Sequence, residues 1–117
     1  MHARTDVFDG VVTAVPAAEK EAYRAFGRLM RGVFKAYGAL EVVDCSGDDV
    51  PPKLTSFPLA VRRARNETVA FGRTTWPSRT ARDEAWKRMM ADWRMQHGAN
   101  PMPFDGKRMI YGGFGKV

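Results

Sequence analysis

The segment of residues 6–15 constrains the fold more than any other part of the chain, because it is apolar on both of its alternating faces. Its apolar side chains are Val7, Val11 and Val15 on one face, and Phe8, Val12 and Ala14 on the other. A strand with one face in water should instead alternate between apolar and polar residues. The segment therefore predicts a strand whose two faces are both covered.

The rest of the chain predicts two long helices and four further strands. Apolar residues recur at helical spacing over residues 17–37, and Ser78 is a suitable N-cap for a second helix that runs to about residue 96. Strands are predicted at residues 40–45, 57–62, 68–76 and 109–114. This order favours an α+β fold on the ferredoxin-like, or split β-α-β, plan, with an antiparallel sheet and two helices on one face. We expect residues 1–117 to form one such domain.

Two helices can cover only one face of this sheet, yet the strands are apolar on both. A partner subunit's sheet would cover the second face through a two-fold interface, so we expect a homodimer that forms an α/β barrel. The alternative is that the loop of residues 51–57 folds over that face.

Composition limits the cellular compartment of the protein and the kinds of partner it can have. The single cysteine, Cys45, excludes an internal disulfide and fits a reducing compartment. The first ten residues contain no apolar leader, and no run approaches the roughly 18 apolar residues of a membrane span. We expect a cytoplasmic protein with no membrane partner. The net charge of +6 raises nucleic acid as a partner.

Four segments carry a resemblance to a known family: FDGVVTAVP, KAYGALEVVDC, TTWPSRTARDEAWKRMMAD and MPFDGKRMIYGGF. Together they resemble the YbaA-like family of small bacterial proteins of unknown function, over residues 8–114. The resemblance implies the dimeric α/β-barrel group of ferredoxin-like proteins. That group includes cofactor-free oxygenases, haem-degrading enzymes, chlorite dismutases and ligand-sensing domains, so it implies no single chemistry.

Polar residues on apolar strands are candidates for ligand binding. Arg73 shares a predicted strand face with Val69 and Phe71, and Asp9 lies between Val7 and Val11. A charge on an apolar face is costly unless it is paired or faces a cavity. Asp9 and Arg73 therefore predict either a structural ion pair or the flanks of a ligand site. Two aromatic residues complete this set: Trp76, at the end of the same strand as Arg73, and Tyr111, which could line a cavity or pack at the sheet edge.

The segment of residues 102–114 allows two interpretations. Asp105 and Gly106 are typical of a turn that starts the last strand. Alternatively, the turn with Lys107 and Arg108 could bind an anion. The pair Gly112-Gly113 is typical of a bulge or of a close backbone approach. The structural interpretation is favoured.

A basic ridge follows the first helix at steps of three or four residues: Lys20, Arg24, Arg28, Arg31 and Lys35. Such a ridge favours a solvated face and, less often, phosphate binding. No nucleic-acid-binding motif accompanies it, so nucleic acid is an unlikely partner.

No metal site or cofactor is expected. The only histidines, His2 and His97, cannot form a multi-histidine site in one chain, and no phosphate-binding or dinucleotide motif is present. Cys45 is predicted to be a small buried residue. The leading hypothesis is a protein that binds a small organic ligand in a barrel cavity. The alternatives are a cofactor-independent oxygenase or isomerase on an aromatic or conjugated substrate, and a non-specific nucleic-acid-binding module.

Overall fold

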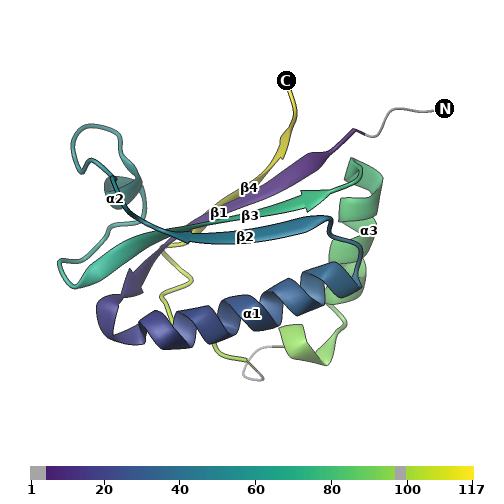
Figure 1. The fold of residues 1–117 in the computed structure, drawn as a ribbon, viewed down its shortest axis with the longest axis horizontal. Coiled ribbons are helices and arrows are strands. Elements are labelled where there is room, and N and C mark those ends of the chain that lie inside the picture. Colours follow the sequence, from purple (N-terminus) through teal and green to yellow (C-terminus); the bar gives the residue numbers. More distant parts are fainter. Residues whose placement is uncertain (1–4, 97–99) are drawn as a thin grey trace.

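The computed structural model describes residues 5–96 and 100–117. Figure 1 shows a sheet with a long helix along it and a second helix at one end. The strands are β1 (Val7–Pro16), β2 (Glu41–Ser46), β3 (Glu67–Trp76) and β4 (Ile110–Gly115). The α-helices are α1 (Lys20–Ala36), α2 (Phe57–Ala60) and α3 (Arg79–Met89), and the 3-10 helices are η1 (Ala17–Glu19) and η2 (Trp93–Met95).

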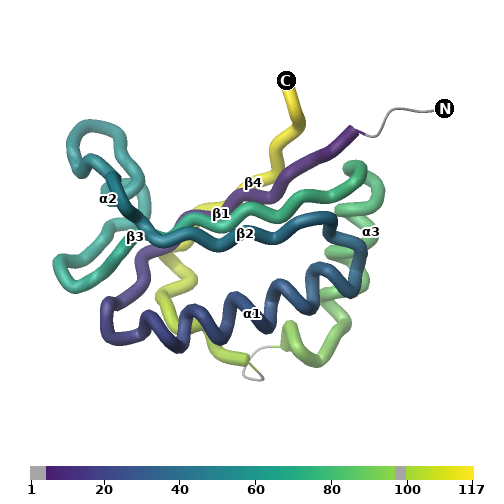
Figure 2. Tube along the Cα trace, viewed as in Figure 1, coloured from purple at the N-terminus to yellow at the C-terminus, as the bar shows by residue number. Residues whose placement is uncertain are grey.

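The four strands form one antiparallel sheet in the order β2-β3-β1-β4. With α1 between β1 and β2, and α3 between β3 and β4, this is the split β-α-β arrangement of the ferredoxin-like fold. The chain trace in Figure 2 shows β1 and β3, which are far apart in the sequence, side by side in the middle of the sheet. The predicted α+β class and topology are confirmed.

Two of the predicted elements differ from the structure. The strand expected at residues 57–62 is wrong: this segment contains the helical turn α2. The Ser56 hydroxyl accepts a hydrogen bond from the Leu59 N–H at 3.3 Å, and Pro58 lies in the first turn. These are helix-start signals that the short apolar run obscured. The second helix begins after the Ser78 cap as predicted, but it ends at Met89, and a separate turn, η2, follows Asp92.

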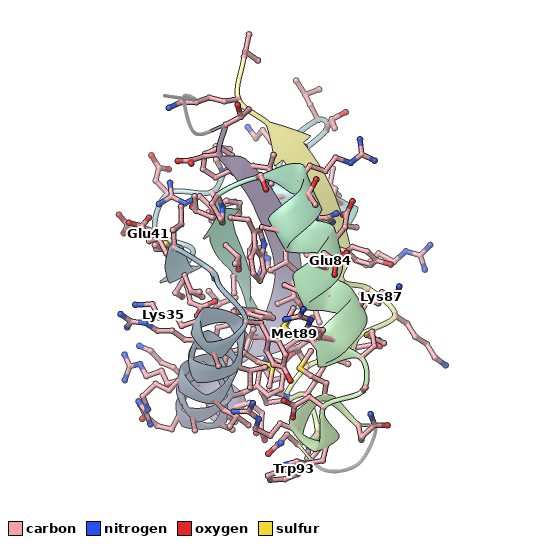
Figure 3. All side chains as sticks on the ribbon, turned by 90° about the vertical axis from the view of Figure 1, so that its right-hand side faces the viewer. Lys35, Glu41, Glu84, Lys87, Met89 and Trp93 are labelled. Atoms are coloured by element: carbon pink, nitrogen blue, oxygen red, sulfur yellow. The ribbon has the colours of Figure 1, made fainter. Side chains whose placement is uncertain are left out.

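The core on the helix side of the sheet lies where α1 and α3 meet β3. Trp76, Met89 and Val33 are fully buried there. The Phe34 ring packs against Trp76 and Trp86, with ring centroids 6.4 and 5.6 Å apart. Figure 3 shows Met89 directed from α3 towards α1, whereas Trp93 extends away from the molecule. Trp93 is 70% exposed, so the apolar stripe of the second helix only partly enters the core.

The opposite face of the sheet is covered at one end only. There Val61, which follows α2, packs on Val12, Ala14 and Val69. Val61 therefore covers part of this face from just beyond α2, and not from the loop of residues 51–57 that the alternative named. Three large apolar side chains from the same face remain exposed: Phe71, Ile110 and Phe114. We call these three residues the open face. Whether a second subunit covers the open face stays a prediction.

Candidate functional site

A cavity of about 600 Å³ lies between α1 and the helix side of the sheet. The side chains on its α1 wall come from Lys20, Tyr23, Arg24, Arg28 and Arg31, with Gly27 between them. Strands β2 and β3 form the other wall, which includes Val42, Asp44 and Ala70. We call this space the α1 cavity. Its volume is within the range of small-molecule sites, which is roughly 300–1,000 Å³.

The basic ridge contributes most of the charge of the α1 cavity. All five ridge residues are exposed, as expected of a solvated face. Four of them nevertheless line the cavity, and only Lys35 does not. Figure 3 shows Lys35 extending from α1 on the side away from α3. The ridge therefore borders an internal space as well as solvent, which its helical period alone did not reveal.

Asp44 lies between Gly27, which lines the α1 cavity, and Gly72, its register partner on β3, which does not line it. A Cβ atom on Gly27 of α1 would stand 3.1 Å from Asp44 Oδ2, and a Cβ atom on Gly72 of β3 would stand 3.1 Å from Asp44 Oδ1. No residue in the ranges 5–96 and 100–117 donates a hydrogen bond to this carboxylate or forms an ion pair with it. Asp44 is thus an exposed acceptor on the cavity wall, and no described residue uses its hydrogen-bonding capacity.

The surroundings of Asp44 and Tyr23 shift both of their pKa values. Asp44 remains accessible from the cavity, but the helix and sheet around it displace enough water for burial to raise the pKa of its carboxyl, against the opposing charge of Arg31. Burial, together with the negative charge of Asp44, raises the pKa of Tyr23 to about 12. The Tyr23 phenol therefore keeps its proton at neutral pH. The cavity combines a hydroxyl donor, a carboxylate acceptor and four cations.

Asp9, a predicted site residue, is fully engaged on the other half of the same sheet face. Its carboxylate accepts hydrogen bonds from Trp76 Nε1 at 2.9 Å, Trp86 Nε1 at 2.8 Å and Arg82 Nε at 2.6 Å. Gly113 makes room for this arrangement, because a Cβ atom there would lie 3.1 Å from Arg82 Nη2. The close approach predicted at the glycine pair is confirmed for Gly113.

The ion pair considered between Asp9 and Arg73 is wrong. Gly10, the residue after Asp9, is the register partner of Arg73, so Asp9 and Arg73 point to opposite faces of the sheet. Arg73 instead pairs with Glu41 on β2. Sequence spacing could not give this result, because it depends on the register between strands.

The turn before β4 is structural. The Asp105 carboxylate accepts a hydrogen bond from the Lys107 N–H at 3.0 Å. The Arg108 guanidinium donates two hydrogen bonds to the Glu67 carboxylate, both 2.7 Å long, and one to the Arg62 carbonyl at 2.9 Å. These bonds fasten the turn to the start of β3. Arg108 is therefore committed to protein partners, whereas Lys107 is exposed.

The six predicted site residues do not gather in one place. Asp9 and Trp76 are joined by a hydrogen bond, and Trp76 is fully buried. Tyr111 is 80% exposed on the edge strand β4. None of the six lines the α1 cavity: Asp9, Arg73, Trp76, Lys107, Arg108 and Tyr111.

Sequence reasoning missed Tyr23, Gly27, Asp44 and Gly72 as a group. A signal existed, because a glycine inside a helix or strand is unfavourable and often marks a close approach. Gly27 and Gly72 are two such residues, and both face Asp44.

Other expectations concern metals, cysteine and membranes. Cys45 is exposed, so its predicted burial is wrong: β2 is an edge strand with little cover at this position. Among the described residues, no group of three or more His, Cys, Asp and Glu residues is placed to hold a metal ion. His2 and His97 lie outside the described residues. Within the same described ranges, no helix has the length and apolar character needed to cross a membrane.

Comparison with known proteins places the chain in a family. Residues 7–106 match the family described as "Protein of unknown function (DUF1428)". The "Uncharacterized protein YbaA" of Escherichia coli strain K12 is 48% identical to this chain over 110 residues. The match covers 93% of this chain and 94% of the relative. The YbaA protein of Shigella flexneri matches with the same identity and coverage. A solved Bacillus cereus structure assigned as an antibiotic biosynthesis monooxygenase is similar at 12% identity and a TM-score of 0.47, covering 97% of this chain and 92% of that one. The chain belongs to the DUF1428 family, and the YbaA-like resemblance of its sequence is confirmed.

Proposed function

We propose that this protein is a homodimer in which each subunit binds a small organic ligand in the α1 cavity. The observation that carries the proposal is a cavity of about 600 Å³ whose Asp44 carboxylate has no partner among the described residues. The Asp44 side chain is exposed, so its lone pairs are open to water and to any molecule that enters the cavity. A ligand with a hydrogen-bond donor can displace this water and keep the acceptor satisfied.

A second candidate function, a cofactor-independent isomerase, is supported by the presence of both Asp44 and Tyr23 in the lining of the α1 cavity. A carboxylate that faces a cavity can accept a proton from an acidic C–H group of a conjugated substrate and return it at another carbon. Tyr23, whose raised pKa keeps the phenol protonated, would donate a hydrogen bond to the substrate oxygen that becomes negative. No oxidant is required for this rearrangement.

The dimer is supported by the open face. Phe71 and Ile110 flank Val12 in adjacent strands, and Phe114 lies opposite Phe8 in the register. Phe71, Ile110 and Phe114 are 42%, 42% and 62% exposed, an apolar surface that a second subunit would cover. We further propose a cytoplasmic location, because an exposed single cysteine suits a reducing compartment.

Ligand binding can be tested by thermal shift with a panel of small organic acids, neutral aromatic compounds and amines. Ligands that bind only the folded state raise Tm by mass action. Gly27→Leu would project a side chain into the α1 cavity beside Asp44, whereas the matched control Gly32→Leu places the same side chain on α1 at a position with nothing within 4 Å. We expect the ligand-induced shift to persist in Gly32→Leu and to vanish in Gly27→Leu. An undiminished shift in Gly27→Leu would exclude this cavity.

The dimer can be tested by light scattering at micromolar concentration. We expect a mass of twice the 13.1 kDa of one chain. Phe114→Glu should dissociate the dimer, because it places a charge on the open face. Tyr111→Glu is the control, since Tyr111 lies on the same strand but on the opposite face of the sheet. A wild-type mass of 13.1 kDa would contradict the proposal.

A further inference from the structure

We propose that the ligand of the α1 cavity is a hydroxylated organic anion, with a carboxylate or phosphate group bound by the arginines of α1 and a hydroxyl group that donates to Asp44. This inference rests on the proposed function and adds the chemical class of the ligand. It follows from the distribution of charge in the cavity and from which charged groups already have partners.

The α1 cavity carries an excess of positive charge. Four cationic side chains and one carboxylate line it. Of the cations, Arg24 is engaged by Glu21 at 2.7 Å. Lys20, Arg28 and Arg31 form no ion pair with any residue that the structure describes, although the charge of Arg31 is near enough to act on Asp44. Cations that border a cavity of this size without internal partners favour an anionic ligand over a neutral one.

The spacing of the arginines suits one compact anion. Arg24, Arg28 and Arg31 follow one another at i, i+4 and i+7, so they lie along one side of α1. Consecutive members are separated by about 4.5–6 Å along the helix axis. Guanidinium groups at this separation can approach two sides of a carboxylate or phosphate, and their planar donor geometry matches the oxygens of either group.

Asp44 sets the second requirement. A ligand made only of anionic groups would be repelled by this carboxylate, which faces the same cavity. The repulsion is avoided if the anionic end lies against α1 and a hydrogen-bond donor points to Asp44. Gly27 and Gly72 leave room for the carboxylate, since a Cβ atom on either would stand 3.1 Å from one of its oxygens. Asp44 is thus an exposed acceptor that lines the same cavity as the cations.

The test uses four probes at matched ionic strength: 3-hydroxybenzoate, benzoate, phenol and glycerol 3-phosphate. Thermal shift and calorimetry on the wild-type chain should rank 3-hydroxybenzoate above benzoate, with phenol giving no shift. Comparing 3-hydroxybenzoate with glycerol 3-phosphate distinguishes a carboxylate ligand from a phosphate ligand. Each variant is compared with the wild type by its dissociation constant for whichever of 3-hydroxybenzoate and glycerol 3-phosphate binds the wild type more tightly.

Arg28→Gln should raise this dissociation constant about tenfold or more, because the change removes a charge-assisted hydrogen bond to the ligand. The matched control is Lys35→Gln, which removes a ridge cation that does not line the cavity and should leave affinity unchanged. Asp44→Asn should keep the binding of benzoate but lose the preference for 3-hydroxybenzoate over it.

Several results would overturn the inference. If phenol binds as well as the anions and Gly27→Leu abolishes its binding, the cavity binds ligands but not this class, and the proposed function stands without the inference. If none of the four probes binds the wild type, the inference is wrong. If Arg28→Gln and Lys35→Gln lower the affinity for the anionic probe equally, the probe is attracted to the charge of the whole ridge and not to the α1 cavity. Tight binding of a single-stranded oligonucleotide, lost equally in those two variants, would assign the ridge to nucleic acid.

Discussion

Asp9 and Asp44 are two carboxylates on the same face of one sheet, and their surroundings are opposite. Asp9, on β1, accepts hydrogen bonds from two indole groups and one guanidinium group. Asp44, on β2, accepts none from the described residues and faces the α1 cavity. The comparison separates a carboxylate that stabilises the fold from one that is left for a ligand.

The packing around the two carboxylates differs in the same way. Near Asp9, the sheet and α3 enclose Trp76 and Met89, and both are fully buried. Near Asp44, most residues in the first half of α1 are exposed, and the helix borders a cavity. Glycine serves both regions: Gly113 admits the Arg82 guanidinium beside Asp9, and Gly27 admits the Asp44 carboxylate beside α1. The region around Asp9 is therefore part of the packed core, whereas the region around Asp44 is accessible to a ligand.

The largest expected effect is the loss of stability in Asp9→Ala. This change leaves the Arg82 guanidinium and two indole N–H groups without their shared acceptor. We expect the free energy of unfolding to fall by about 2–4 kcal/mol, less than for a fully buried pair, because the ion pair of Asp9 and Arg82 is only partly buried. Urea denaturation measures the change. Asp83→Ala is the control: Asp83 also binds Arg82, at 2.9 Å, but it is half exposed and should cost less than about 1 kcal/mol. If Asp9→Ala and Asp83→Ala lose the same free energy of unfolding, the three hydrogen bonds to Asp9 do not stabilise the fold more than an exposed ion pair does.

Gly113→Val should have the next largest effect. Its side chain would displace the Arg82 guanidinium, which Asp9 holds in place, and the expected loss is about 1–3 kcal/mol. Gly115→Val is the matched control on the same strand, because nothing lies within 4 Å of a Cβ atom there. If both variants unfold at the same urea concentration, the close approach at Gly113 has no energetic role.

The pair of Glu67 and Arg108 predicts a dependence of stability on pH. Hydrogen bonds from Arg108 are the main cause that lowers the pKa of Glu67 from 4.5 to about 2. Because the pKa is lower in the folded state, the stabilisation is fully present above pH 4.5 and is lost as the pH falls from about 5 towards 2. Glu67→Gln should be about 1–2 kcal/mol less stable at pH 7 and should lose less stability on acidification. Parallel pH profiles of the two proteins would contradict this.

Lys107→Ala should have the smallest effect. The Lys107 side chain is exposed, and the turn uses only its backbone N–H, which donates to Asp105. The expected change is below about 0.5 kcal/mol. A melting series with and without phosphate at matched ionic strength extends this prediction. A phosphate-induced shift that Lys107→Ala abolishes would move the anion site from the α1 cavity to this turn.

Most of the fold could be predicted from the sequence, because apolar periodicity reports the strands and the long helices directly. Gly38 also ends the first helix as its position suggests, with a positive φ of 106°. The α2 turn was missed because residues 57–62 form an apolar run too short to distinguish a helix from a strand. The error reflects local ambiguity rather than a wrong topology.

The candidate site was far less predictable. The ridge of α1 was visible as a helical pattern, but no local pattern reports how far a helix stands from a sheet. Asp9 was correctly chosen as an unusual charge on an apolar strand, yet its partner, Arg82, comes from α3 rather than from the strand of Arg73. Both failures concern distances between elements, which depend on register and packing.

The most direct test of the contrast between the two carboxylates is the free energy of unfolding of Asp9→Asn and Asp44→Asn, measured side by side by urea denaturation at pH 7 without ligand. Asp9→Asn should lose about 1–3 kcal/mol, because the amide replaces one accepting oxygen with an NH2 group that faces a donor, and removes the charge that Arg82 pairs with. Burial raises the pKa of Asp44, so its ionised form opposes folding above that pKa, and Asp44→Asn should be as stable as the wild type or more stable. A loss in Asp44→Asn as large as that in Asp9→Asn would show that Asp44 is already partnered within the protein, and would contradict its assignment to a ligand.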